Sequence, residues 1–104
     1  MQLAILATGM TIALPLHAAD DHAERAIKQR VAPIYPELAK RMRVSGVVRI
    51  AATVAPDGTV SSTKTVSGNH MLSGAAEDAV HKWKFVAEPN ESTVEVDVSF
   101  ALAQ

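Results

Sequence analysis

The feature that most constrains the fold of this chain is a strict alternation of residue type close to its carboxyl end. Between residues 93 and 102, every second side chain is apolar: Val94, Val96, Val98, Phe100 and Leu102. The residues between them are mostly polar or small: Glu95, Asp97, Ser99 and Ala101. Because successive side chains of a strand point to opposite faces, this segment is predicted to be a strand with one buried and one solvated face.

Residues 71–85 carry the spacing of the main helix. Their apolar residues recur at helical intervals along one face: Leu72, Ala75, Ala76, Ala79 and Trp83. Asn69 is a candidate N-cap, since its short side chain can accept a hydrogen bond from the first turn.

A shorter helix is predicted from Tyr35-Pro36 to about Arg43, because proline favours the first helical position. Ala39 and Met42 are expected to face inward. Gly46 breaks the helical pattern.

A hairpin lies between the two helical segments. The apolar residues Val48, Ile50, Ala52 and Val54 alternate as in a half-buried strand. Ala55-Pro56-Asp57-Gly58 then has the composition of a type I turn, and residues 59–66 return as a largely polar outer strand. The predicted fold class is therefore α+β: two helices packed on one face of a three-stranded antiparallel sheet, in the order α-β-β-α-β.

The order and spacing of these features resemble the C-terminal, receptor-binding domain of the TonB family over about two thirds of the chain. The residues that carry the resemblance are Tyr35-Pro36, Ala39, Gly46-Val47-Val48, Val54, Asp57-Gly58, Val60, Leu72, Ala75, Ala79, Lys82-Trp83-Lys84-Phe85, Pro89 and the alternating segment 94–100. Pro89 departs from the family pattern, because it stands further from the Trp-Lys-Phe motif than in most members. The resemblance implies the same fold and a periplasmic binding module.

A three-stranded sheet has edges whose free N–H and C=O groups can pair with another extended chain. In TonB, the last strand takes up the short TonB-box peptide of an outer-membrane receptor in this way. The resemblance therefore implies a peptide-binding site formed by Tyr35, Thr93, Val94, Glu95, Val96, Asp97, Val98, Ser99 and Phe100. The alternatives are an edge that pairs two copies into a homodimer and an edge that has no ligand.

The composition argues against enzymatic chemistry. The chain has no cysteine, and its serines stand in no nucleophile motif. His70 and His81 lie about 16 Å apart along one predicted helix, which is too far for a shared metal ion. A net charge of −1 without interleaved aromatic residues does not favour nucleic-acid binding. We therefore predict no catalytic residue, no metal and no cofactor.

The amino-terminal end is predicted to direct export. Residues 1–18 have the apolar stretch and small-residue end of a signal peptide, although no Lys or Arg precedes that stretch. A membrane anchor is the alternative, but the 14 apolar or uncharged residues 3–16 would span only about 21 Å of a hydrocarbon core of roughly 30 Å. Residues 19–32 are predicted to be a tether or a frayed helix, and residues 33–104 the domain.

These observations predict a periplasmic module that binds an outer-membrane transporter peptide and is accessory to energised transport, since no Pro-rich spacer is present. A structural, self-associating envelope protein is the first alternative. An anchored TonB-type energy transducer with a misassigned start is the second, and only then would the chain contact the membrane.

Overall fold

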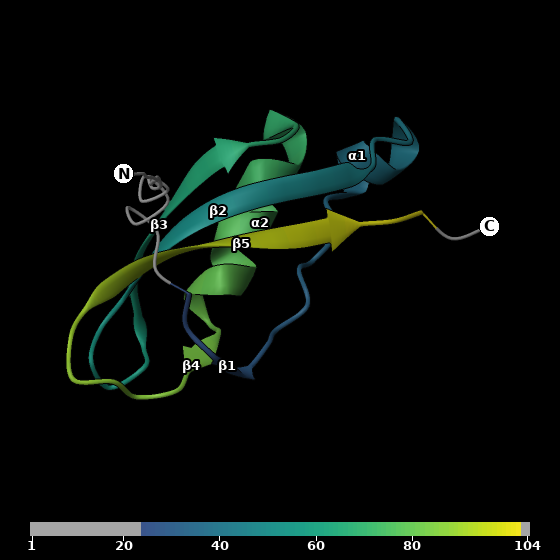
Figure 1. The fold of residues 1–104 in the computed structure, drawn as a ribbon. Coiled ribbons are helices and arrows are strands. Elements are labelled where there is room, and N and C mark those ends of the chain that lie inside the picture. Colours follow the sequence, from purple (N-terminus) through teal and green to yellow (C-terminus); the bar gives the residue numbers. More distant parts are fainter. Residues whose placement is uncertain (1–23, 103–104) are drawn as a thin grey trace, which may run out of the picture.

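The structure is a computed structural model that describes residues 24–102, so the predicted signal segment and the start of the predicted tether lie outside the described residues. Its elements are β1 (Ile27–Gln29), α1 (Glu37–Arg41), β2 (Gly46–Val54), β3 (Val60–Ser67), α2 (His70–His81), β4 (Lys84–Phe85) and β5 (Ser92–Phe100). Figure 1 shows a sheet of three long strands with α2 across one face and α1 at the end where β2 begins.

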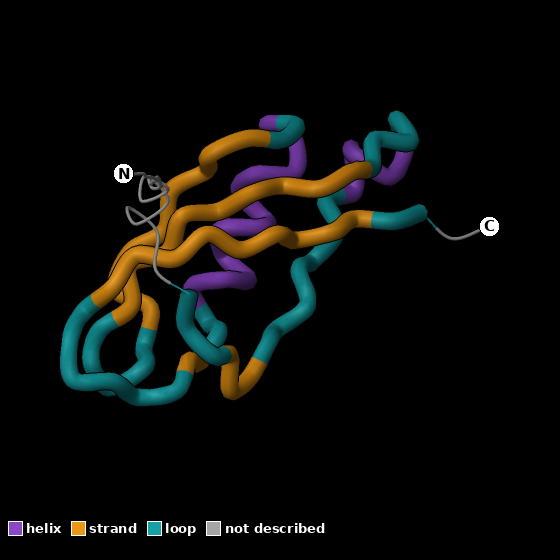
Figure 2. Tube along the Cα trace, in the orientation of Figure 1, coloured by secondary structure: helices purple, strands orange, loops and turns teal. Residues whose placement is uncertain are grey.

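The three long strands form an antiparallel sheet in the order β3-β2-β5, which confirms the predicted α+β fold. Strand β2 lies in the centre, and its side chains Val48, Ile50, Ala52 and Val54 are fully buried beneath α2. The opposite face of the sheet carries no helix in the described part of the chain (Figure 2). One face is therefore core and the other is open to solvent.

Helix α2 begins as the sequence predicts, because the Asn69 side chain accepts a hydrogen bond of 2.8 Å from the Met71 N–H. It ends at His81 rather than at residue 85. Two residues in a helix are turned by about 200°, so Trp83 and Phe85 could not both face the core in a continued helix. The chain instead turns at Lys82 and becomes extended, and Trp83 and Phe85 are only 3% and 2% exposed.

Helix α1 ends at Arg41, earlier than predicted. Met42 was expected to face inward, but its side chain is 60% exposed and does not contribute to the core. The cause is a Schellman turn: the Arg43 N–H bonds to Lys40 O, and the Val44 N–H bonds to Ala39 O. This turn places Arg43 in the left-handed region at φ 55°. It also brings Val44, instead of Met42, against the core beside the fully buried Ala39.

Residues 24–32 differ from the expected tether or frayed helix. Strand β1 pairs with β4, with Ile27 opposite Phe85, and the Val86 N–H donates to Ala26 O at 2.9 Å. Ile27 and Val31 pack against the core. The segment lacks a continuous apolar pattern, so its attachment depends on contacts with residues far away in the sequence.

Candidate functional site

Strand β5 is an edge strand. It pairs with β2 along its whole length, from Gly46 opposite Phe100 to Val54 opposite Ser92. Among residues 24–102, no strand pairs with its other side. In an antiparallel ladder, alternate residues of such a strand direct their N–H and C=O groups away from the sheet. The strand that the sequence nominates for docking therefore presents a row of outward backbone groups.

The side chains of β5 divide between the two faces of the sheet. Val94, Val98 and Phe100 are buried in the core, while Val96 is half-buried. The polar residues Thr93, Glu95, Asp97 and Ser99 alternate with them, as the sequence predicts.

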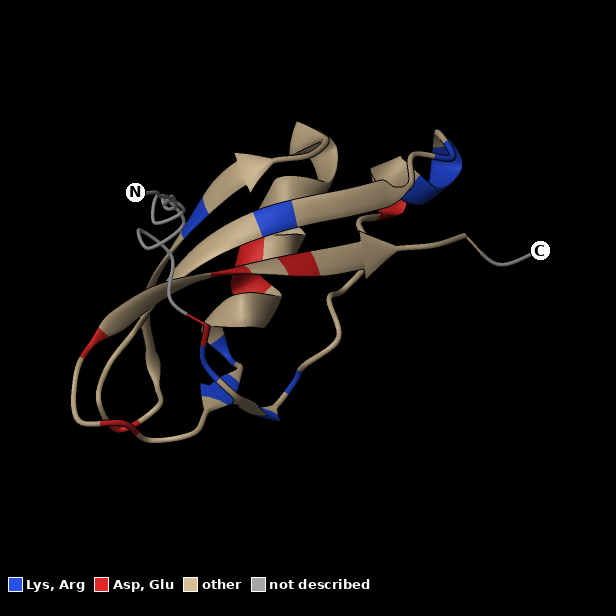
Figure 3. Cartoon of the chain, in the orientation of Figure 1, with Lys and Arg blue, Asp and Glu red and all other residues tan. Residues whose placement is uncertain are grey.

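Arg49 of β2 organises the charges on the open face. Its Nε donates to Asp97 Oδ1 at 2.9 Å and its Nη2 to Asp97 Oδ2 at 3.3 Å, while its Nη1 lies 3.5 Å from Glu95 Oε1. These hydrogen bonds hold the pKa of Asp97 below its usual value and raise the pKa of Arg49. Figure 3 shows the basic segment of β2 beside the acidic segments of β5. The two carboxylates are thus bound by the neighbouring strand β2.

A groove of about 820 Å³ runs beside the middle of β5. One wall is formed by the strand residues Val94, Glu95, Val96 and Asp97. The other wall comes from the amino-terminal segment, through Glu24, Arg25, Ala26, Ile27 and Arg30. In Figure 1, β1 lies on the opposite side of β5 from β2. The free edge of β5 is therefore one side of a two-walled groove.

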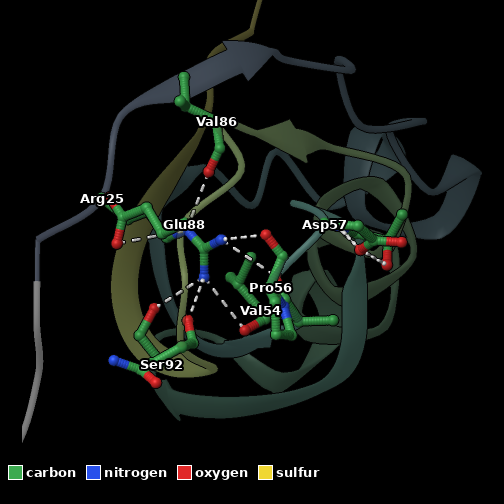
Figure 4. Close-up of polar contacts among 10 residues, drawn as sticks. Arg25, Val54, Pro56, Asp57, Val86, Glu88 and Ser92 are labelled. Carbon is green, nitrogen blue, oxygen red and sulfur yellow. Dashed lines mark hydrogen bonds and ion pairs between the residues drawn. The ribbon is translucent and has the colours of Figure 1, made fainter.

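Arg25 fastens the second wall. Its side chain is fully buried, with an exposed fraction of 0%, and it is surrounded by carbonyl groups (Figure 4). Its acceptors are Val54 O, Ala55 O, Pro56 O, Val86 O, Asn90 O and Ser92 Oγ, at 3.0 to 3.4 Å. Glu88 lies 3.8 Å from its Nε and balances its charge. One side chain thus joins the segment to the end of β2, the following turn and the start of β5.

Trp83 fastens the other end of the same segment. Its indole Nε1 donates to Val31 O at 2.9 Å, and the Arg30 guanidinium lies over its ring, 4.8 Å from the centroid. Both contacts involve the buried indole, so they hold residues 30 and 31 in place where the chain leaves the groove after β1.

The sequence model of the family described as "Gram-negative bacterial TonB protein C-terminal" matches residues 31–102. The chain belongs to the TonB C-terminal family. A protein named "Protein TonB" from Klebsiella pneumoniae is 30% identical over 80 residues, which are 75% of this chain and 32% of that protein. The chain therefore spans about a third of the length of that relative, and the predicted family resemblance is confirmed.

The match to the TonB family begins after the second wall. Arg25 and the other groove residues of the amino-terminal segment precede residue 31, whereas β5 lies wholly inside the matched region. The free edge is thus part of the TonB family domain. The second wall, which Arg25 attaches, consists of residues that precede the region matched by the family model.

Tyr35 has a different environment from the one expected of a groove residue. Its ring meets the Phe100 ring edge-on, with centroids 5.4 Å apart and an interplanar angle of 83°. Its hydroxyl donates a hydrogen bond to Val44 O. The acceptor is the carbonyl of the Schellman turn, which sequence spacing does not reveal. Tyr35 therefore supports the end of β5 without lining the groove.

The structure brings only the middle of the nominated strand into the groove. Val94 to Asp97 line it, whereas Thr93, Val98, Ser99 and Phe100 lie outside it. Sequence reasoning missed every residue of the second wall. The apolar residues Ile27 and Val31 were a weak signal of attachment, but nothing in the sequence marked Arg25 as buried.

Among residues 24–102, no three His, Asp or Glu side chains gather as metal ligands. Within the same residues, no helix has the length and apolar content needed to cross a membrane.

Proposed function

We propose that this chain is a periplasmic binding domain that takes up an extended segment of an outer-membrane receptor as an added strand on β5. The observation that carries the proposal is the free edge of β5, which faces a groove rather than open solvent. Main-chain hydrogen bonds would supply affinity in such a complex, and the alternate side chains of the segment would supply selectivity.

The proposed docking strand extends from Thr93 to Phe100, with Val94 to Asp97 as its central part in the groove. Val96 is half-buried, so it offers an apolar surface without leaving the core. Tyr35 would act at one end by holding Phe100 in place. We propose no catalytic step, cofactor or metal for this site.

Family membership supports the partner and the compartment. The TonB family is a non-enzymatic family of the Gram-negative envelope that energises transport and interacts with outer-membrane receptors. This chain corresponds to about a third of the Klebsiella relative, so we do not carry that protein's whole role over to it. We favour an accessory role, in which the domain binds receptor segments in the periplasm.

An NMR titration of the isotope-labelled chain tests the proposal. The probes are eight-residue peptides that cover the periplasmic amino-terminal segments of outer-membrane receptors from the same bacterium. We expect saturable amide shifts concentrated between residues 92 and 100, and smaller ones on β3, which is the other edge. If no amide shifts appear at millimolar peptide, the proposal is contradicted.

The same free edge supports a second candidate, in which two copies pair along β5. Sedimentation of the chain without peptide separates the two candidates. A concentration-dependent dimer that persists in excess peptide would favour self-association. A monomer that binds peptide would favour the receptor-binding function.

A further inference from the structure

Arg25 is the one buried charged or polar residue among residues 24–102. Its guanidinium has five N–H donors in a planar fork, and the structure places an acceptor near each of its three nitrogens. Removing a buried guanidinium from water is costly unless its hydrogen bonds are satisfied. The chain satisfies them with backbone carbonyls from three separate places. Such an arrangement fixes the position of the main chain on either side of Arg25.

Apart from Arg25, the segment is held by Ile27 against the core, by the Val86 N–H bond to Ala26 O and by Arg30 over the Trp83 ring. Strand β1 has only three residues and β4 has two, and a two-stranded pair of this size is marginal in water by itself. Glu24, Ala26 and Arg30 have exposed side chains. Arg25 supplies the side-chain hydrogen bonds that hold residues 24–30 opposite the middle of β5.

We infer that Arg25 is a positioning residue for peptide binding, which keeps residues 24–30 in place as the second wall of the groove. This inference rests on the proposed function of β5. The incoming peptide is bounded by β5 on one side and by Ala26 and Ile27 on the other. At about 3.4 Å per residue, the part of β5 that lines the groove accommodates about four residues of an extended peptide.

A fixed second wall affects mainly the lifetime of the complex. A peptide on an open edge is held by one strand, whereas a peptide in the groove must also leave the wall before it dissociates. Pre-ordering the wall also removes the entropic cost of ordering residues 24–30 at the moment of binding. Loss of Arg25 therefore raises the dissociation rate more than it lowers the association rate.

The first test compares Arg25→Met with Lys28→Met in the full chain. Both variants lose one cation from the same segment. The Lys28 side chain, however, is exposed and is not among the residues that line the groove. The probe is the receptor peptide that binds most tightly in the titration described above. We expect a Kd at least tenfold higher for Arg25→Met, through faster dissociation, and a change of less than twofold for Lys28→Met.

Two checks separate positioning from a general loss of fold. Amide hydrogen exchange of β2 must remain protected in Arg25→Met for its Kd to be interpreted. Arg25→Lys keeps the charge but has only three donors on a compact ammonium, so we expect an intermediate dissociation rate. A merely structural role would change the unfolding midpoint of these variants without changing the dissociation rate.

A second measurement leaves Arg25 intact, so that a variant unable to fold does not decide the matter. The chain has no cysteine, so one introduced thiol is unique. Ala26→Cys places a thiol on the second wall, and Ser61→Cys places one on the exposed part of β3. With oxidised glutathione as the oxidant, peptides that carry one cysteine at successive positions should form disulfides with Ala26→Cys and not with Ser61→Cys.

The outcomes distinguish the two proposals. Equal binding by the parent chain and a folded Arg25→Met, with no cross-linking at residue 26, would overturn the role of Arg25 and leave strand addition intact. No binding of any peptide by the parent chain would overturn the proposed function, and the role of Arg25 with it.

Discussion

Asp97 lies directly opposite Arg49 in the register of β5 and β2, and the two side chains are joined by two hydrogen bonds of 2.9 and 3.3 Å. The pair holds a carboxylate of the edge strand against its paired neighbour β2. The acidic side chain therefore does not have to be displaced before another strand approaches the free edge.

The pH dependence of this pair follows from the sign of the shift. The hydrogen bond from Arg49 lowers the pKa of Asp97 in the folded state. Its stabilising contribution is thus present above the unfolded pKa, near 3.9, and is lost as pH falls through the lower folded pKa. We expect a carbon-detected NMR titration of Asp97 to give a midpoint below 3.9. In Arg49→Gln, the midpoint should return toward that value, and an unchanged midpoint would contradict the assignment.

Blocking the free edge of β5 should weaken peptide binding, whereas the same change on the other edge, β3, should not. Val96→Lys places a long charged side chain in the groove, whereas Val66→Lys places the same side chain on β3, where Val66 is already 49% exposed. We expect Val96→Lys to raise the Kd of the receptor peptide at least tenfold, and Val66→Lys to leave it within twofold. Calorimetric titration gives both values, and equal losses would indicate that β5 is not the docking strand.

The turn between β2 and β3 tolerates no side chain at Gly58. Its φ is +95°, and a Cβ there would collide with the carbonyl oxygen of Phe85. Gly46 also has a positive φ, of +137°, but its Cβ would meet nothing within 4 Å. We expect Gly58→Ala to lower the free energy of unfolding by about 3 kcal/mol, and Gly46→Ala by about 1 kcal/mol. Urea unfolding monitored by circular dichroism measures the difference, and similar losses would contradict the collision.

Gly74 offers a stabilising substitution. It lies inside α2 with an exposed surface, and a Cβ there would meet nothing within 4 Å. Because alanine has the higher helix propensity, we expect Gly74→Ala to raise the free energy of unfolding by about 1 kcal/mol. The thermal midpoint should rise by several degrees. An unchanged Kd for the receptor peptide is the control, since no residue of α2 lines the groove.

The sequence predicted those parts of the fold whose signals are local. Alternation identified β2 and β5, and Asn69 marked the start of α2 because a cap acts within one turn. The free edge followed from the strand count and the family resemblance. The early end of α2 could have been predicted too, since Trp83 and Phe85 cannot share a helical face.

The second wall could not be predicted for a physical reason. Arg25 is a charged residue in a polar segment, and its acceptors lie between 29 and 67 residues away. Burial of such a side chain depends on carbonyl groups that only the folded chain brings together. The second wall of the groove therefore depends on tertiary contacts that the sequence does not reveal, whereas the edge strand β5 can be predicted from residue alternation.

The position of Trp83 makes its fluorescence sensitive to the attachment of the second wall. It is the single tryptophan of the chain, it is 3% exposed, and its contacts include Arg30 and the carbonyl of Val31 at the end of the second wall. Release of that wall would remove the cation from the ring and admit water to the indole, while the sheet stayed folded. The emission of an unlabelled sample can thus report whether the second wall is attached, in the parent chain and in Arg25→Met alike.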